Sequence, residues 1–166
     1  MEYLIENQPV FTTLTIKLLQ GELVKAEAGS MVSMSSTVEL DAKATNKGIF
    51  NSLKAAVGGE SFFTSLFTAK DGPGEVILAP PTPGDIKKFP LTGSTIFAQS
   101  GAYLAGSADL ELSTQGSFKS MIAGENLFLQ KINGQGLVFL HAYGSVFEKY
   151  LDDDETYVID TGHLVA

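Results

Sequence analysis

The chain of 166 residues contains no cysteine, no tryptophan and no arginine, and all 11 of its basic residues are lysines. Without cysteine, disulfide frameworks, thiolate nucleophiles and cysteine-ligated metal centres are excluded. Without arginine, the chain lacks the guanidinium fork that commonly grips phosphates, carboxylates and guanine edges. Several common classes of functional site are therefore removed before any motif is considered.

Positive charge and long apolar runs are also scarce. Nineteen acidic residues against 11 lysines give a formal net charge of −8. Such a surface repels nucleic-acid phosphates and anionic lipids, so we expect no nucleic-acid partner. The longest apolar run falls far short of the ~20 residues that span a bilayer. Because the first residues carry acids among apolar residues, we expect neither a secretory nor a mitochondrial leader in them. We therefore expect a cytoplasmic protein without a membrane span.

What the chain does contain is an internal repeat. Similar segments recur in the same order, and the spacing between matched positions shrinks steadily from the pair Gly29 and Gly101 to the pair Gly72 and Gly134. The same order with small deletions indicates a duplicated module. We predict one domain over 1–166, in which the first repeat covers 1–85, the second 86–150, and 151–166 begins a third.

Within each copy, apolar and polar residues alternate with a period of two. Leu14, Ile16 and Leu18 are each separated by a polar residue, and the runs 76–78 and 137–140 are apolar throughout. Alternation predicts half-buried strands, and continuous runs are typical of strands covered on both faces. This pattern predicts an all-β sandwich or barrel. Glycine and proline predict turns at 72–74, 80–84 and 134–136.

One segment in each copy departs from this alternation. Apolar residues recur at helical spacing in 49–57 and in 118–122, and a glycine follows each segment. We predict that each forms a short helical lid that seals one end of its β unit. A docking surface for a membrane or a partner helix is the alternative.

Residues present in every copy are expected to serve the backbone that the copies share. Gly29, Gly101 and Gly162 recur at one position and are predicted to lie in tight turns that need a positive φ. Glu60 and Glu125 each follow a glycine, and their carboxylates are predicted to accept backbone N–H bonds at the end of a lid. The alternative is a symmetric pair for acid–base chemistry.

Residues present in only one copy are better candidates for a ligand or partner site, and they are His141, Tyr143, Asp160 and His163. Two histidines and a carboxylate could ligate a metal, but a capped or core histidine is the more common situation. No Gly-x-Ser-x-Gly elbow and no phosphate loop is present, and the acids at 152–155 are typical of a solvated turn. We expect no metal, no cofactor and no catalytic residue.

Seven ordered segments, spread over nearly the whole chain, carry a resemblance to a known family. They are 28–32, 59–63, 79–85, 101–105, 123–128, 136–144 and 160–165. The segments resemble the altered-inheritance-of-mitochondria family of mitochondrial biogenesis proteins, whose bacterial members form a domain of unknown function. The resemblance implies pseudo-threefold β-sandwich units, as in the tryptophan RNA-binding attenuation protein. It supplies no catalytic residues.

These observations favour a non-enzymatic scaffold or protein-interaction module that acts through oligomeric assembly. The third repeat stops early in this sequence, and unpaired strand edges invite pairing with another chain. We therefore expect a homo-oligomer, or a rearranged third unit in which the N-terminal strand fills the gap. The alternative is a small-metabolite binder with its site near His141, Tyr143 and His163. An unfamiliar enzyme and an RNA binder are less favoured.

Overall fold

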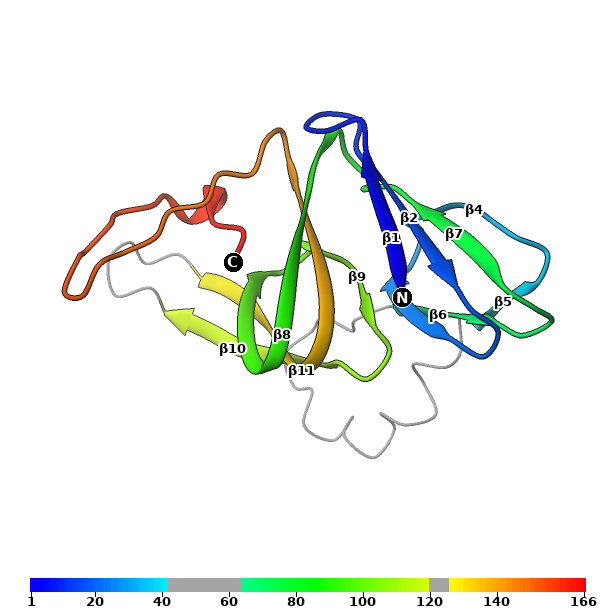
Figure 1. Ribbon diagram of the computed structural model, residues 1–166. Coiled ribbons are helices and arrows are strands. Elements are labelled where there is room, and N and C mark those ends of the chain that lie inside the picture. Colours follow the sequence, from blue (N-terminus) through cyan, green and yellow to red (C-terminus); the bar gives the residue numbers. More distant parts are fainter. Residues whose placement is uncertain (42–63, 120–125) are drawn as a thin grey trace.

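The computed structural model describes residues 1–41, 64–119 and 126–166, and its strands form two antiparallel sheets (Figure 1). The first sheet has the order β1 (Glu2–Glu6), β2 (Thr13–Leu18), β7 (Gly74–Leu78) and β4 (Met31–Met34). The second has the order β10 (Glu111–Lys119), β11 (Asn126–Tyr143), β9 (Tyr103–Ser107), β3 (Leu23–Glu27), β6 (Thr64–Ala69) and β5 (Val38–Asp41). A further strand, β8 (Gly84–Gln99), pairs with β11.

This architecture confirms the all-β class. The helical element in the described ranges is a single 3-10 turn, η1 (Thr161–His163), close to the C-terminus. None of the described residues forms a helix with the length and apolar character needed to cross a membrane.

The alternation seen in the sequence explains how the two sheets pack. In β2, Leu14, Ile16 and Leu18 are buried while the residues between them are more exposed, because successive side chains of a strand point to opposite faces. These side chains meet others from β3, β6, β7, β8, β9 and β11 in a first core. Phe139 lies in this core, and its ring meets that of Tyr3 edge to face with centroids 5.2 Å apart.

A second core is formed by β8, β9, β11 and the turns beside them. The long strands β8 and β11 can bend around it because their pairing contains a bulge. The register shifts between Gly134 and Gln135 and skips Gly93, whose φ of +86° is the left-handed conformation that glycine adopts readily. The predicted turn at 134–136 is therefore wrong, because β11 runs through these residues without reversing direction.

The pairings of the first half of the chain recur in the second half. Glu27 pairs with Thr64, and the residues that match them in the second copy, Gln99 and Leu129, pair with each other. Apart from β1·β2, the strand pairs within the first half have such a counterpart. The matched pairs are β3·β6 with β8·β11, β5·β6 with β10·β11, β2·β7 with β8·β11, and β4·β7 with β9·β11. The repeat boundaries stay a prediction, which these registers support.

Local hydrogen bonds recur in the same way. The Ser35 hydroxyl accepts from the Glu75 N–H at 3.0 Å, and the Ser107 hydroxyl accepts from the Leu137 N–H at 3.0 Å. A turn in which one carbonyl accepts from the amide three residues later recurs at matched positions of the first two copies and at the predicted start of the third. These bonds join Glu27 to Ser30 (3.2 Å), Gln99 to Ala102 (3.0 Å) and Asp160 to His163 (2.9 Å).

The predicted helical lids are not supported where they can be examined. Phe118, the first residue of the second lid, lies in β10 and pairs with Leu127, so no helix begins there. Phe118 and Lys119 are extended because the backbone of β11 supplies hydrogen-bond partners for this end of β10. The first lid at 49–57, residues 120–122 of the second lid, and both Glu60 and Glu125 lie outside the described residues.

The first core predicts a large difference between two phenylalanine positions. Replacing the fully buried Phe139 with alanine should lower the free energy of unfolding by about 3–5 kcal/mol, because it leaves a cavity and removes the contact with Tyr3. Phe147→Ala, at a side chain that is 83% exposed, is the matched control and should cost less than about 0.5 kcal/mol. Urea unfolding of both variants measures the difference, and equal losses would contradict this packing.

Candidate functional site

His141 lies near the end of β11, and its side chain is buried. The backbone N–H of His141 donates to the Ala102 carbonyl at 2.7 Å. The backbone N–H of its counterpart Ala79 donates to the Ser30 carbonyl at 2.9 Å. The backbone role of this position is thus the same in both halves, and only the side chain differs. The imidazole Nε2 lies 3.6 Å from Oε2 of Glu27, and neither ring nitrogen has a hydrogen-bond partner among the described residues.

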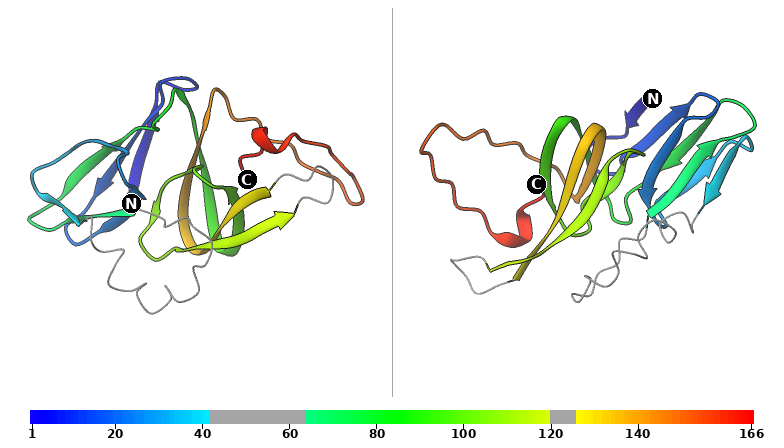
Figure 2. Two further views of the ribbon diagram at one scale, coloured as in Figure 1. Left: turned by 180° about the vertical axis from the view of Figure 1, so that it is seen from behind. Right: turned by 90° about the horizontal axis from the view of Figure 1, so that it is seen from below.

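The other three predicted site residues lie elsewhere. Tyr143 ends β11 with a side chain that is 81% exposed. Asp160 caps η1, where its carboxylate accepts the Gly162 N–H at 3.0 Å, and His163 is exposed at the end of that turn. Figures 1 and 2 show η1 apart from the end of β11. Within the described residues, no three histidine, aspartate or glutamate side chains are placed to hold a metal ion.

The three recurring glycines do not share one conformation. Gly29 and Gly101 have φ values of +89° and +85°, the left-handed region that a tight turn requires. Gly162 has no positive φ and lies inside η1, so the positive φ predicted for it is wrong. The Asp160 carboxylate bonds its N–H instead, which stabilises a helical turn at this third site.

Six of the large apolar side chains that are exposed among the described residues lie in the C-terminal segment 144–166. The segment leaves the end of β11, runs away from both sheets and returns through η1 (Figures 1 and 2). Its end is fixed by a hydrogen bond from the Gln99 N–H to the Val165 carbonyl at 2.8 Å, and Val165 packs against the second core. The exposed side chains are Phe147, Tyr150, Leu151, Tyr157, Val158 and Ile159.

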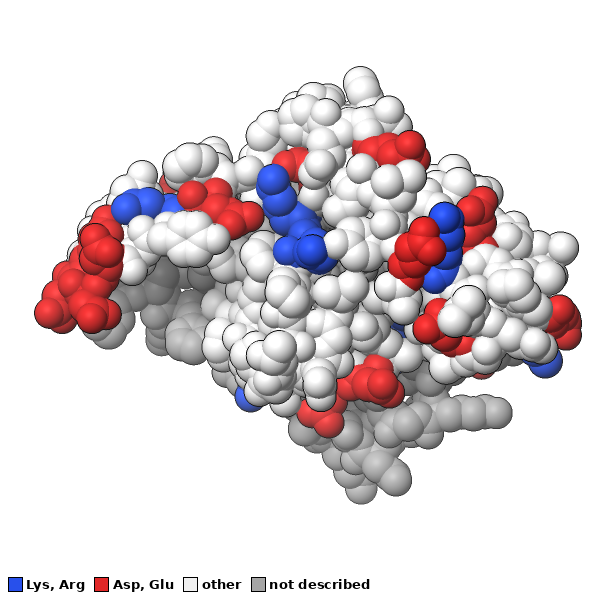
Figure 3. Space-filling model, in the orientation of Figure 1, with Lys and Arg blue, Asp and Glu red and all other residues white. Residues whose placement is uncertain are grey.

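The charge of this segment is concentrated at its tip. Acidic side chains gather at the far left of the face seen in Figure 3, and the run Asp152–Glu155 supplies them. Lys149 forms an ion pair with Glu155 at 2.8 Å and lies 5.4 Å from the centre of the Tyr157 ring. Outside that run the charged residues of the segment are Glu148, Lys149 and Asp160, and residues 156–159 carry no charge.

A second exposed apolar surface lies on β4, at the opposite end of the molecule in Figure 1. All four residues of β4 are exposed, and within the described ranges β4 pairs with β7 alone. Its counterpart β9 lies between β11 and β3, and its first four residues are buried. The equivalent strands of the two repeats thus differ: β9 has neighbours on both edges, and β4 has a neighbour on one edge among the described residues. Sequence reasoning missed this surface, although the uncharged run Met31–Met34 was a signal for it.

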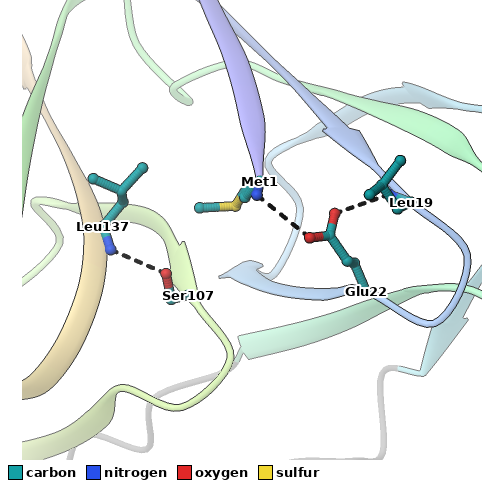
Figure 4. A network of polar contacts seen from close by, with 5 residues as sticks. All are labelled: Met1, Leu19, Glu22, Ser107 and Leu137. Carbon is teal, nitrogen blue, oxygen red and sulfur yellow. Dashed lines mark hydrogen bonds and ion pairs between the residues drawn. The ribbon is translucent and has the colours of Figure 1, made fainter.

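An open depression of about 600 Å³ lies beside β1 and the turn that follows β2. The Met1 amino group lies 3.4 Å from Glu22, and the same carboxylate accepts the Leu19 N–H at 2.8 Å (Figure 4). The Leu19 bond lowers the pKa of Glu22. Lys17 and Glu2 pair at 2.8 Å, and this hydrogen bond raises the pKa of Lys17. These four charged groups are paired with one another, so they do not indicate a binding site for a charged ligand.

Comparison with known proteins agrees with the fold. The family described as mitochondrial biogenesis AIM24 matches residues 3–166 of the chain. The chain belongs to this family. An uncharacterised protein of Streptococcus pyogenes serotype M6 is 33% identical over 175 residues, which cover all of this chain and 70% of the streptococcal protein. The family match therefore extends over almost the whole length of this chain.

A solved structure extends the comparison. The crystal structure of a protein from Streptococcus pyogenes is 28% identical and superposes with a TM-score of 0.68 over 87% of this chain. This AIM24-family chain spans 65% of the length of that protein, slightly less than two thirds. The comparison supports the fold and assigns no reaction to any residue.

The environment of His141 predicts that its imidazole can be replaced at little cost in this AIM24-family chain. His141→Leu should change the free energy of unfolding by less than about 1 kcal/mol, because a buried polar group without partners contributes no net hydrogen bond. Leu140→Ala, at the fully buried neighbouring position, should cost about 2–5 kcal/mol and serves as the control. A loss above about 2 kcal/mol in His141→Leu would show that the imidazole is bonded, contrary to this description.

Proposed function

We propose that this chain is a non-enzymatic protein-interaction module that acts by assembly, first of all with further copies of itself. The observation that carries the proposal is the pair of uncovered surfaces described above, the apolar C-terminal segment and the free edge of β4. Both combine exposed apolar side chains with backbone that is unpaired among the described residues, on one edge of β4 and along residues 156–159.

The physical argument rests on what water does to such surfaces. Exposed apolar side chains that lie next to one another favour burial against a partner. A free strand edge presents unpaired N–H and C=O groups that another strand can satisfy. A single partner strand can both cover the apolar side chains and pair the free backbone groups. Strand pairing with a protein is therefore the interaction that these surfaces support best.

The described polar residues support the non-enzymatic part of the proposal. The candidate residues His141 and Tyr143 lie on β11, and Asp160 and His163 lie at η1, so no cluster of potential acid, base and nucleophile is assembled from them. Four charged groups around the open depression beside β1 are paired, the Met1 amino group with Glu22 and Lys17 with Glu2. Neither place brings together the groups that general acid–base or nucleophilic catalysis requires.

The proposal predicts that the protein is larger than its 17.7 kDa monomer mass in solution and that its size grows with concentration. Sedimentation velocity over a wide range of concentrations measures this. Added salt should leave the association intact or strengthen it, because apolar burial and backbone pairing are weakly screened whereas contacts between exposed charges are strongly screened. A monomer at every concentration would overturn the proposed function.

A further inference from the structure

We infer that β4 of one molecule pairs with residues 157–159 of a second copy, in the antiparallel register that joins β3 to β9 inside the chain. The inference rests on the proposed function and names the partner and both surfaces. It follows from the internal contact between the two repeats, from the position of the C-terminal segment in the third copy, and from the placement of β4.

The internal contact shows what the pairing looks like when both strands are present. β3 of the first repeat lies beside β9 of the second, with Lys25 opposite Gly106 and Ala26 opposite Ala105. The Tyr103 hydroxyl donates to the Lys25 carbonyl at 3.2 Å across the same contact. With β3 on one side and β11 on the other, β9 is removed from solvent.

The C-terminal segment occupies the place of β3 in the third copy. The turn bond from Asp160 to His163 has the same form as the bonds that follow β3 and β8. The bond between Gln99 and Val165 adds a second match. Extending the β3·β9 register by one residue places Glu27 opposite Leu104, and the counterparts of these two residues in the next copies are Gln99 and Val165. The third copy thus begins on the second as the second lies on the first.

Carrying the same register forward by one repeat defines the proposed pairing. Residues 157–159 correspond to 24–26 of β3, and Ser33 and Met34 of β4 correspond to Ala105 and Gly106 of β9. The predicted opposite residues are Tyr157 with Ser35, Val158 with Met34, and Ile159 with Ser33. Tyr157 and Ile159 then take the places of Val24 and Ala26, which are both buried.

We assign the partner to a second copy because β4 and residues 157–159 of one molecule do not meet in this structure. β4 and the C-terminal segment lie at opposite ends of the molecule in Figure 1 and in both views of Figure 2. The new contact would continue the internal interface β3·β9 from one molecule to the next. Each molecule offers one donor segment and one acceptor edge, so the contact is heterologous and successive molecules add head to tail.

The composition of the strand edges agrees with this assignment. Neither 31–34 nor 156–159 contains a charged residue or a proline. The outer edge of β8 contains Lys87, Lys88 and Pro90, the residue types that block strand addition. The edges differ as expected if β4 accepts a strand and β8 does not.

Engineered cysteines test the register directly, because the chain has no cysteine of its own. Residues opposite each other on paired antiparallel strands have Cβ atoms ~5 Å apart, close enough for a disulfide after small adjustment. Oxidising a mixture of Ser33→Cys and Ile159→Cys should give a reducible covalent dimer. Leu19→Cys mixed with Ile159→Cys is the control and should give none, since Leu19 is 69% exposed but lies outside the pairing.

Two charge variants test whether the contact is head to tail. Val158→Asp places a charge in the segment 157–159, and Met34→Asp places one on the edge of β4. Both side chains are exposed, so each variant should fold, and each should remain monomeric when alone. Mixed, they should form a one-to-one dimer, because each retains the surface that the other lacks. Phe147→Asp, equally exposed but outside the register, should associate like the unmodified chain. Circular dichroism confirms folding.

Two outcomes would overturn the inference. The first is the absence of a disulfide between molecules in the mixture of Ser33→Cys and Ile159→Cys, or a disulfide that forms only within one molecule when a single chain carries both substitutions. The second is that Val158→Asp or Met34→Asp associates as strongly as the chain without substitutions. If the unmodified chain associates and these substitutions leave its association unchanged, this inference fails while the proposed function stands. If the unmodified chain is monomeric at every concentration, the proposed function fails as well.

Discussion

The ladder between β3 and β9 is the interaction on which the rest of the structure depends. It is the point where backbone groups of the first repeat are satisfied by backbone groups of the second, and it lies between the two cores. Tyr103, whose burial raises the pKa of its phenol, is fixed there by the Lys25 carbonyl. Because buried backbone groups must be paired, a strand in this position without a neighbour cannot be buried. Within the described ranges, this requirement explains why β9, with two neighbouring strands, is enclosed and β4, with one, is exposed.

The close approach of matched strands depends on glycine at two equivalent places. A Cβ atom at Gly136 would lie 2.5 Å from the side chain of Ser107, and one at Gly74 would lie 3.0 Å from that of Ser35. These are the same two serines whose hydroxyls accept from the neighbouring strand. Small residues and short polar side chains thus fix the register at this position in both halves.

Much of the fold could be predicted from the sequence, because period-two alternation reports directly which side chains face a core. Leu14, Ile16 and Leu18 illustrate this. The turn at 134–136 was wrong because glycines permit a bulge as readily as a reversal, and only the partner strand decides between them. The candidate site was predicted less well. Differences between copies made His141 a candidate, but nothing in the sequence shows that, among the described residues, β9 has a second neighbouring strand and β4 has none.

The lysines and proline on β8 give the molecule a polarity that its repeated architecture would otherwise lack. Identical modules with identical borders would accept neighbours on every side and grow into a two-dimensional aggregate. Here one border is closed by Lys87, Lys88 and Pro90 and another is left uncharged. Under the proposed assembly, growth restricted to one direction ends as a small ring or stops at a single incoming strand. The two unlike borders would then limit how many copies gather at one place.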